Sequence, residues 1–323
     1  MFDFILISPW LMALAIIVGF VLLIFGADWL VDGASAIAKR FGVSNLVIGL
    51  TVVALGTSMP EFVVSIIAAA GHNTNIAITN ILGSNTINTF IILGFTALIY
   101  PISSQRSCRR FDMPLSLLAG IMVLGFAAYS GAIEWWGGIC LLFVFIIFMI
   151  HSFRYAKNPE VERSDETEEI KPLPLWKALL LSLLGLGGLF IGGEAVVRGA
   201  VGIAHLLHVS DAIIGLTIVA LGTSLPELAT SCVAAAKHNA DLALGNVIGS
   251  NIFNVFFILG TGALIHPLSI YDGIWLDAAM VVLSSLMVML FVYTTKNHEI
   301  KRWHGALLVL VYTTYLTYRI ISL

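Results

Sequence analysis

The sequence predicts an all-α integral membrane protein whose ten transmembrane helices form two inverted five-helix repeats. Three observations lead to this prediction. Hydrophobic residues make up 59% of the 323, only 11% are charged, and the mean hydropathy is +0.99. Apolar runs long enough to cross the ~30 Å hydrocarbon layer of a bilayer recur along the whole chain. An internal duplication also divides the chain into two halves with an odd number of spans each.

Each predicted span is a run of about 20 or more mostly apolar residues, the length that a helix needs to cross the bilayer. The short alternating segments of a membrane barrel do not occur, so helices are expected, because a helix satisfies its own backbone hydrogen bonds in lipid. The ten expected spans are residues 10–38, 43–71, 76–100, 113–131, 133–153, 176–205, 209–236, 241–266, 274–294 and 303–321. Because the opening apolar run is too long for a cleavable signal peptide, we interpret it as the first span.

The basic residues predict the orientation, because Lys and Arg of short loops stay on the cytoplasmic side. Of the 16 basic residues, 14 fall in loops after odd-numbered spans. These are Lys39, Arg40, Arg106, Arg109, Arg110, Arg154, Lys157, Arg163, Lys171, Lys177, Lys237, Lys296, Lys301 and Arg302. We therefore expect a multi-pass protein of the cell inner (plasma) membrane with both termini outside the cytoplasm. The net charge of −3 gives no indication of nucleic-acid binding.

The duplication is found by laying residues 43–101 over 209–267 without gaps, which gives 34 identities in 59 positions. The predicted organisation is a first repeat over 1–155, a linker over 156–174 and a second repeat over 175–323. Because five spans bring the chain to the opposite side, the second repeat enters the membrane inverted. This is the plan of many secondary transporters, whose substrate site lies near the midplane where the repeats meet. Packing alone would not retain acidic, hydroxyl and amide side chains at that depth.

One duplicated motif reads ALGTSMPE over residues 54–61 and ALGTSLPE over residues 220–227, each in the middle of a span. A carboxylate at bilayer depth costs at least ~2.5 kcal/mol and marks a candidate functional site. A pairing with a basic residue on another helix is the structural alternative, but no Lys or Arg lies deep in the second, third, seventh or eighth span. Glu61 and Glu227 are therefore expected to be neutralised by a mobile cation.

Proline and the neighbouring polar groups add further oxygen ligands to this motif. Because proline lacks an N–H, Pro60 and Pro226 should free the carbonyls of Gly56 and Gly222. Hard cations such as Ca²⁺ take six to eight oxygens from carboxylates, carbonyls and hydroxyls. The third and eighth spans bring further candidates, of which hydrogen bonding between helices is the structural alternative. They are Asn80, Gly83-Ser84-Asn85 and Asn88, matched by Asn246, Gly249-Ser250-Asn251 and Asn254.

The paired motifs, ALGTSMPE with NILGSNTIN and ALGTSLPE with NVIGSNIFN, resemble the repeat signatures of the calcium/cation antiporter superfamily. The resemblance is to the sodium/calcium exchangers and their prokaryotic relatives, and it covers nearly the whole chain. It implies a secondary antiporter that exchanges Ca²⁺ for Na⁺ by alternating access and has no resident cofactor. It also implies electrogenic transport, because more positive charge would cross as Na⁺ than as Ca²⁺.

The resemblance implies the ion ligands residue by residue. Glu61 and Glu227 would hold Ca²⁺ with the backbone carbonyls of Thr57 and Thr223. Two flanking Na⁺ sites would each use one backbone carbonyl and two serines, and two asparagines would lie beside the centre. These groups are the Ala54 carbonyl with Ser58 and Ser250, the Ala220 carbonyl with Ser224 and Ser84, and Asn88 with Asn254. The long first and sixth spans would slide across the core, with Asp28 and Glu194 in structural or gating roles.

Two features separate this chain from parts of the superfamily. Potassium-dependent exchangers usually have Asp where this chain has Asn254, so K⁺ cotransport is not expected. The short linker leaves no room for the large regulatory domain of animal exchangers. We expect a single chain to be the functional unit.

Other functions remain open at this stage. Protons on Glu61 and Glu227 could replace Na⁺, which would make the protein a Ca²⁺/H⁺ or other divalent cation/H⁺ antiporter. An intramembrane enzyme would need a nucleophile or a metal site, yet His72 and His238 fall at span ends without partners at metal spacing. A non-transporting scaffold would not need acids at the midplane. The cysteines, Cys108, Cys140 and Cys232, are too far apart in sequence for a disulfide framework or a thiolate metal site.

Overall fold

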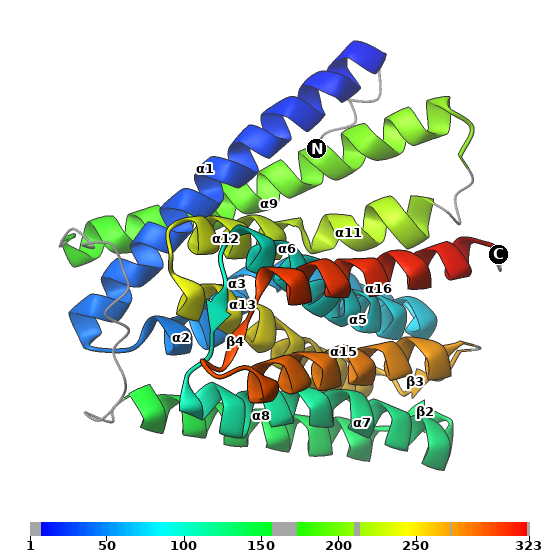
Figure 1. Ribbon diagram of the computed structural model, residues 1–323. Coiled ribbons are helices and arrows are strands. Elements are labelled where there is room, and N and C mark those ends of the chain that lie inside the picture. The colour runs from blue at the N-terminus through cyan, green and yellow to red at the C-terminus, as the bar shows by residue number, and fades with distance from the viewer. Residues whose placement is uncertain (1–7, 157–172, 210–213, 272, 322–323) are drawn as a thin grey trace.

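The computed structural model describes residues 8–156, 173–209, 214–271 and 273–321, and most of them are helical (Figure 1). Seven of the described helices are long and apolar enough to cross a membrane, and two bent helix pairs bring this number to nine. The tenth expected span is α16 (Arg302–Ile321), which is less apolar because it carries Tyr and Thr side chains. The chain is therefore a multi-pass membrane protein with a helix at each expected position. Most of the expected linker lies outside the described residues.

The two halves contain similar series of elements. The first half contains α1 (Pro9–Phe41), α2 (Asn45–Ile48), η2 (Gly49–Val53), α3 (Ala54–Thr57), α4 (Met59–Ala70), α5 (Thr74–Ile87), η3 (Asn88–Ile92), α6 (Leu93–Ile99), β1 (Ile102–Ser103), η4 (Cys108–Asp112), α7 (Met113–Ser130), β2 (Ala132–Ile133) and α8 (Trp135–Ala156). The second half contains α9 (Leu175–Leu206), η5 (Gly215–Val219), α11 (Ala220–Thr223), α12 (Leu225–Ala236), α13 (Ala240–Ile252), η6 (Phe253–Leu259), α14 (Gly260–Ile265), β3 (Leu268–Ser269), α15 (Ile274–Thr294), β4 (Glu299–Ile300) and α16. The elements labelled η are π-helical stretches within spans, and α2 and η4 are described in the first half alone.

The short strands show that the halves are inverted relative to each other. β1 and β3 occupy equivalent places in the two repeats, and so do β2 and β4. β1 pairs antiparallel with β4, and β2 pairs antiparallel with β3, so each ribbon joins one strand from each half. The β1–β4 ribbon and the β2–β3 ribbon lie at opposite ends of the helix bundle (Figure 1). Equivalent strands therefore face opposite sides of the membrane, as the odd number of spans predicts.

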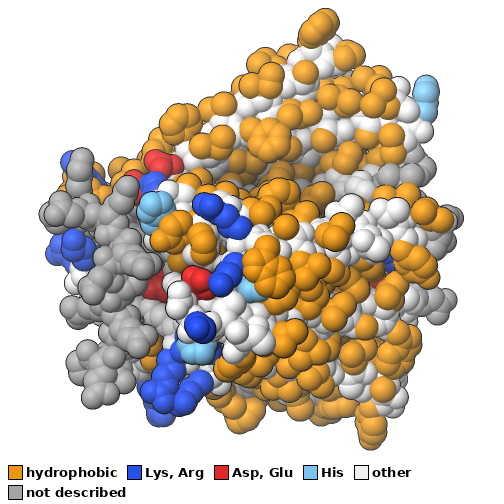
Figure 2. Space-filling view, viewed as in Figure 1, with side chains coloured by type: hydrophobic (Ala, Val, Ile, Leu, Met, Phe, Trp, Pro, Cys, Tyr) orange, Lys and Arg blue, Asp and Glu red, His pale blue; other side chains and the backbone are white. Residues whose placement is uncertain are grey.

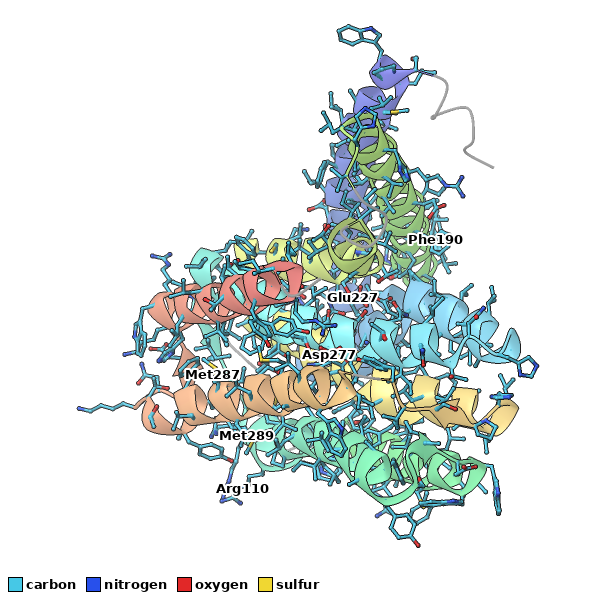
Figure 3. The ribbon with its side chains drawn as sticks, turned by 90° about the vertical axis from the view of Figure 1, so that its right-hand side faces the viewer. Arg110, Phe190, Glu227, Asp277, Met287 and Met289 are labelled. Atoms are coloured by element: carbon cyan, nitrogen blue, oxygen red, sulfur yellow. The ribbon has the colours of Figure 1, made fainter. Side chains whose placement is uncertain are left out.

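The long helices α1 and α9 form a pair that stands apart from the other helices (Figure 3). Glycines line their contact. A Cβ atom on Gly26 would lie 2.8 Å from the carbonyl oxygen of Gly185, and one on Gly192 would lie 2.7 Å from that of Gly19. Such spacing leaves room for backbone alone, which is the usual way that membrane helices approach closely without a hydrophobic driving force. The 33 and 32 residues of α1 and α9 confirm that the first and sixth spans are unusually long.

The spans that carry the polar motifs form the centre of the protein. In the most apolar stretch of the third span (74–99), 78% of the residues are buried, and in that of the eighth span (240–265) the share is 94%. The corresponding share for α8, at the periphery, is 28%. The close approach of α13 to the second span requires glycine, since a Cβ on Gly245 would lie 2.6 Å from the carbonyl oxygen of Leu46. The two copies of the NxxGSN motif are therefore enclosed by protein instead of lipid.

One ion-pair cluster ties α1 to the central helices. Lys237, which follows the last residue of α12, lies 2.7 Å from Asp28 and 2.5 Å from Asp32 of α1. Burial lowers the pKa of Lys237, but the hydrogen bonds and charges of the two aspartates raise this pKa by more, so it lies above its usual 10.5. The equivalent position in the first repeat is Gly71, so the repeat supplies no second copy of this cluster.

We predict that Lys237→Met lowers stability by no more than about 1 kcal/mol, because half-exposed ion pairs contribute little. Because folding raises the pKa of Lys237, the stability that its ion pairs contribute is fully present at neutral pH. This stability is lost only as the pH rises above 10.5. Thermal unfolding in detergent at several pH values measures it. The matched control is Lys296→Met in the exposed loop after α15. An equal loss in the control, or a loss that disappears below pH 9, would contradict the assignment.

Candidate cation site

The two repeat glutamates each lie in the first turn of a helix that begins at a sharp break. The second and seventh spans bend by 50° and 57°, and the breaks fall at Ser58 and Ser224. Glu61 of α4 and Glu227 of α12 follow three residues later, and both are fully buried. A helix N-terminus carries partial positive charge, so each carboxylate lies where its own helix stabilises negative charge. In Figure 3, Glu227 lies near the middle of the helix bundle.

Serines from both repeats hold one oxygen of each carboxylate. Ser224 and Ser84 donate to Glu61 Oε1 at 3.1 and 3.3 Å. The equivalent serines of the other repeat, Ser58 and Ser250, donate to Glu227 Oε1 at 2.9 and 3.5 Å. Each glutamate thus accepts one bond from the serine at the helix break of the opposite repeat. It accepts a second bond from the serine of the next span in its own repeat. The structure therefore brings together the two groups of serines that the resemblance assigns to the two flanking Na⁺ sites.

Among the predicted ligands, four buried carboxylate and amide oxygens have no hydrogen-bond donor in the described part of the chain. They are Oε2 of Glu61, Oε2 of Glu227, Oδ1 of Asn88 and Oδ1 of Asn254. Unpartnered buried acceptors are costly and call for an explanation. Among the described residues, none of the recorded ion pairs reaches either glutamate, whereas the buried Asp277 accepts from Tyr315 and lies 3.7 Å from Arg319. Carboxylate, amide and hydroxyl oxygens without a basic partner form a donor set that suits hard cations.

The remaining predicted ligands lie in the same breaks. The hydroxyl of Thr57 lies 3.1 Å from the Asn246 side-chain oxygen and 3.1 Å from the Val53 carbonyl, so its single proton has two protein acceptors. The Ala54 carbonyl already accepts from the Ser58 N–H at 3.0 Å and would have to share its oxygen with an ion. Thr223 and Ala220 occupy the equivalent places in the second repeat, where the Thr223 hydroxyl has no partner.

The carbonyls that the prolines were predicted to free lie at the two breaks. The helix ends at each break, so Pro60 and Pro226 fall in the first turn of a new helix, where a missing N–H has no cost. The Ser58 N–H donates to the Ala54 carbonyl and also approaches that of Gly56, and the Ser224 N–H approaches that of Gly222. The break itself therefore interrupts the regular helical bonding of these carbonyls, and each proline begins the next helix.

Asn80 and Asn246 act as donors. Asn80 donates to the Glu61 backbone carbonyl at 3.3 Å and to Ser65 at 2.9 Å. Asn246 makes the same two bonds, to the Glu227 carbonyl at 3.3 Å and to Ser231 at 2.9 Å. These amides fasten the glutamate helix to the neighbouring span. The two serines were missed as functional residues, although the repeat alignment retains both.

The two sides of the site differ. Ala54 and Thr57 are buried, whereas the equivalent Ala220 and Thr223 are partly exposed. A Cβ on Gly249 would lie 2.6 Å from the carbonyl oxygen of Leu50, yet one on the equivalent Gly83 would meet nothing within 4 Å. Among the described side chains, α13 is therefore packed more closely at Gly249 than α5 is at Gly83. The side chain of Leu216, which is equivalent to Leu50, lies outside the described residues.

The two retained histidines take part in helix-end structure, as predicted. His72 and His238 both have left-handed backbone conformations, with φ of 61° and 55°. Histidine is among the few non-glycine residues that adopt this conformation readily. His238 stacks on Tyr100 at 4.5 Å, and the ring of His72 meets that of His266 edge-on at 4.4 Å. No group of three metal-binding side chains that include His or Cys occurs in the described parts of the chain.

An inverted-repeat membrane fold around two buried carboxylates is typical of a secondary cation transporter. The comparisons with known proteins agree. A sequence model of the family described as sodium/calcium exchanger protein matches residues 11–154 and 177–321. The chain therefore belongs to the sodium/calcium exchanger family, and it is a transporter and not an enzyme.

Individual relatives are similar over nearly the whole chain. The sodium/calcium exchanger MaX1 of Methanosarcina acetivorans is 34% identical, over 94% of this chain and 97% of its own. The inner membrane protein YrbG of Escherichia coli is 39% identical over 78% of this chain and 79% of its own. A structure of the sodium-calcium exchanger NCX_Mj, soaked with Na⁺ and Ca²⁺, superimposes with a TM-score of 0.82 and 35% identity, covering 95% of this chain and 98% of that one.

The site geometry predicts the effect of neutralising either carboxylate. Glu61→Gln and Glu227→Gln should each reduce Ca²⁺ transport by roughly 100-fold or more, since one charge contact at about 4 Å is worth about 4 kcal/mol at an effective dielectric constant of about 20. Reconstituted flux measures this loss, and thermal unfolding in detergent verifies folding. Asp277→Asn is the matched control, because Asp277 is a buried acid that already has protein partners. Wild-type flux in either Gln variant would show that the carboxylates are not the ion site.

Proposed function

We propose that this chain exchanges Ca²⁺ for Na⁺ across the cell inner membrane. The observation that supports it most directly is the pair of fully buried carboxylates, each with one oxygen held by serines and the other unpartnered. Such oxygens need a mobile positive charge, and an ion that provides it can leave again. The family membership supports a calcium/cation antiporter, and the counter-ion is our proposal.

In this proposal, Ca²⁺ occupies the centre and Na⁺ the flanks. Glu61 and Glu227 hold Ca²⁺ with the backbone carbonyls of Thr57 and Thr223. The two serines that donate to the same glutamate oxygen form one flanking Na⁺ site, together with one backbone carbonyl. These groups are Ala54, Ser58 and Ser250 on one side, and Ala220, Ser224 and Ser84 on the other. Asn88 and Asn254 lie beside the centre and contribute amide oxygens.

Charge explains how the two ions can be coupled. Two ionised carboxylates match one Ca²⁺, so loading of more than two Na⁺ leaves the site positive. Transport of that load is electrogenic, and the membrane potential contributes ~2.3 kcal/mol per charge per 100 mV. Competition for the same oxygens makes the exchange obligatory, provided that the empty, negatively charged site crosses poorly. We propose one chain as the functional unit, with no resident cofactor and both termini outside the cytoplasm, opposite the basic loops.

The experiment that tests the proposal is Ca²⁺ uptake into proteoliposomes with an outward Na⁺ gradient, an outward H⁺ gradient, or neither. We expect uptake only with the Na⁺ gradient. Because more than two Na⁺ would leave for each Ca²⁺ that enters, positive charge moves outward, so uptake should increase when the vesicle interior is made positive and decrease when it is made negative. Glu61→Gln proteoliposomes provide the background. Uptake driven by the H⁺ gradient alone would contradict Na⁺ as the counter-ion. It would indicate that protons bind the same carboxylates in exchange for Ca²⁺.

A second prediction concerns potassium. Because Asn254 offers an oxygen without a charge, an additional K⁺ beside the ion load would leave unbalanced positive charge in a low-dielectric site. Na⁺-driven Ca²⁺ uptake should therefore proceed at equal rates in K⁺ and in choline buffer when the membrane potential is clamped. An absolute requirement for K⁺ would contradict this reading of Asn254.

The serines allow the flanking sites to be tested separately. Ser58→Ala, Ser84→Ala, Ser224→Ala and Ser250→Ala should each raise the half-saturating Na⁺ concentration more than the half-saturating Ca²⁺ concentration. Each removes a hydroxyl oxygen from a flank and leaves both central carboxylates in place. Ser152→Ala, in a buried position of α8, is the matched control. Equal losses for both ions would argue against separate Na⁺ positions.

A further inference from the structure

Four asparagines meet where the two most deeply buried spans cross. Asn85 and Asn88 come from the end of α5 and the start of η3, and Asn251 and Asn254 come from α13 and η6. All four side chains are at most 2% exposed. Within each pair the spacing of three residues places both side chains on one helix face. The cluster therefore joins the first repeat to the second directly beside the candidate cation site.

The hydrogen bonds in this cluster cross between the repeats. Asn88 donates its amide N–H to the Asn251 side-chain oxygen at 3.2 Å, and Asn254 donates to the Asn85 side-chain oxygen at 3.0 Å. Asn85 in turn donates to the Asn251 backbone carbonyl at 3.1 Å, and Asn251 donates to the Thr89 hydroxyl at 2.8 Å. Asn85 and Asn251 thus use both ends of their amides. Asn88 and Asn254 use only their nitrogens, and their oxygens remain unpartnered.

We infer that Asn85 and Asn251 are positioning residues that turn the amide oxygens of Asn254 and Asn88 toward the transported cation. An amide has an oxygen on one side and an NH₂ on the other, and its terminal torsion is broad and roughly two-fold. Without an acceptor for the NH₂ group, either side could face the ion, and the NH₂ side would repel it. The acceptors on Asn85 and Asn251 remove this ambiguity.

The inference rests on the proposed function and adds a coupling between the repeats to it. The oxygen of Asn254 is oriented by a residue of the first repeat, and that of Asn88 by a residue of the second. A complete ion shell therefore requires the two central spans to stay in register. A carboxylate would need no such help, because both of its oxygens are acceptors. The positioning function is thus specific to an amide at position 254.

The difference between an amide and a carboxylate provides the test, a double-mutant cycle of Asn85→Leu and Asn254→Asp. Asn85→Leu should raise the half-saturating Ca²⁺ concentration roughly 10-fold, as expected for one lost favourable contact, with little change in maximal rate. In the Asn254→Asp background, the same change should not weaken Ca²⁺ affinity. Calorimetric Ca²⁺ binding to the purified variants gives a second readout that does not depend on transport.

Thr86→Val is the matched control for loss of a buried polar group in the same helix. It removes a hydroxyl that donates to the Leu82 carbonyl of its own helix, and it leaves the asparagine bonds in place. Its Ca²⁺ affinity should equal that of the wild type. A 10-fold loss from Asn85→Leu in both backgrounds, or unchanged affinity with only lower thermal stability, would overturn the inference. If Na⁺ failed to drive uptake, Na⁺ would be ruled out as the counter-ion, but this inference would stand. The double-mutant cycle measures Ca²⁺ affinity, which does not depend on the counter-ion.

Discussion

Two carboxylates buried near each other without a basic partner impose the constraint on which the rest of this structure depends. Each ionised group would be unstable in a low-dielectric interior unless several weaker interactions offset its desolvation. The protein provides two serine donors for each, a helix N-terminus beneath each, and asparagines that anchor the helices that carry them. These groups support the charge incompletely, which is what a site that must bind and release cations requires.

The duplication explains how one short motif can surround an ion. Each break serine reaches the glutamate of the opposite repeat, so neither half can form the site alone. The repeats are nevertheless not packed identically. Gly249 lies against Leu50, whereas no described atom would lie within 4 Å of a Cβ on Gly83, and Lys237 pairs with α1 where the first repeat has Gly71. Departures from symmetry of this kind distinguish the two sides of the membrane in a protein built from equivalent halves.

The α1–α9 pair differs in character from the helices that enclose the site. Its inner contact brings backbone against backbone at Gly19, Gly26, Gly185 and Gly192, with buried side chains such as Leu30 and Leu189 between these points. Contacts of this kind hold helices close by van der Waals packing. The core beneath it is held by directional hydrogen bonds between buried amides and hydroxyls. The pair contacts the core mainly along α12, where Lys237 pairs with Asp28 and Asp32 and Asn239 donates to Ser35.

The spans, the inverted repeats and the burial of Glu61 and Glu227 could be predicted from the sequence, because hydropathy, an odd span count and a retained acid in an apolar span are properties of the chain read locally. The direction of each hydrogen bond did not follow. Asn80 and Asn246 are donors that brace a helix, and Ser58 bonds the glutamate of the other repeat, because both outcomes depend on side chains brought together from distant segments. The carbonyls of Gly56 and Gly222 depended on where the helix breaks, and only the tertiary structure decides that.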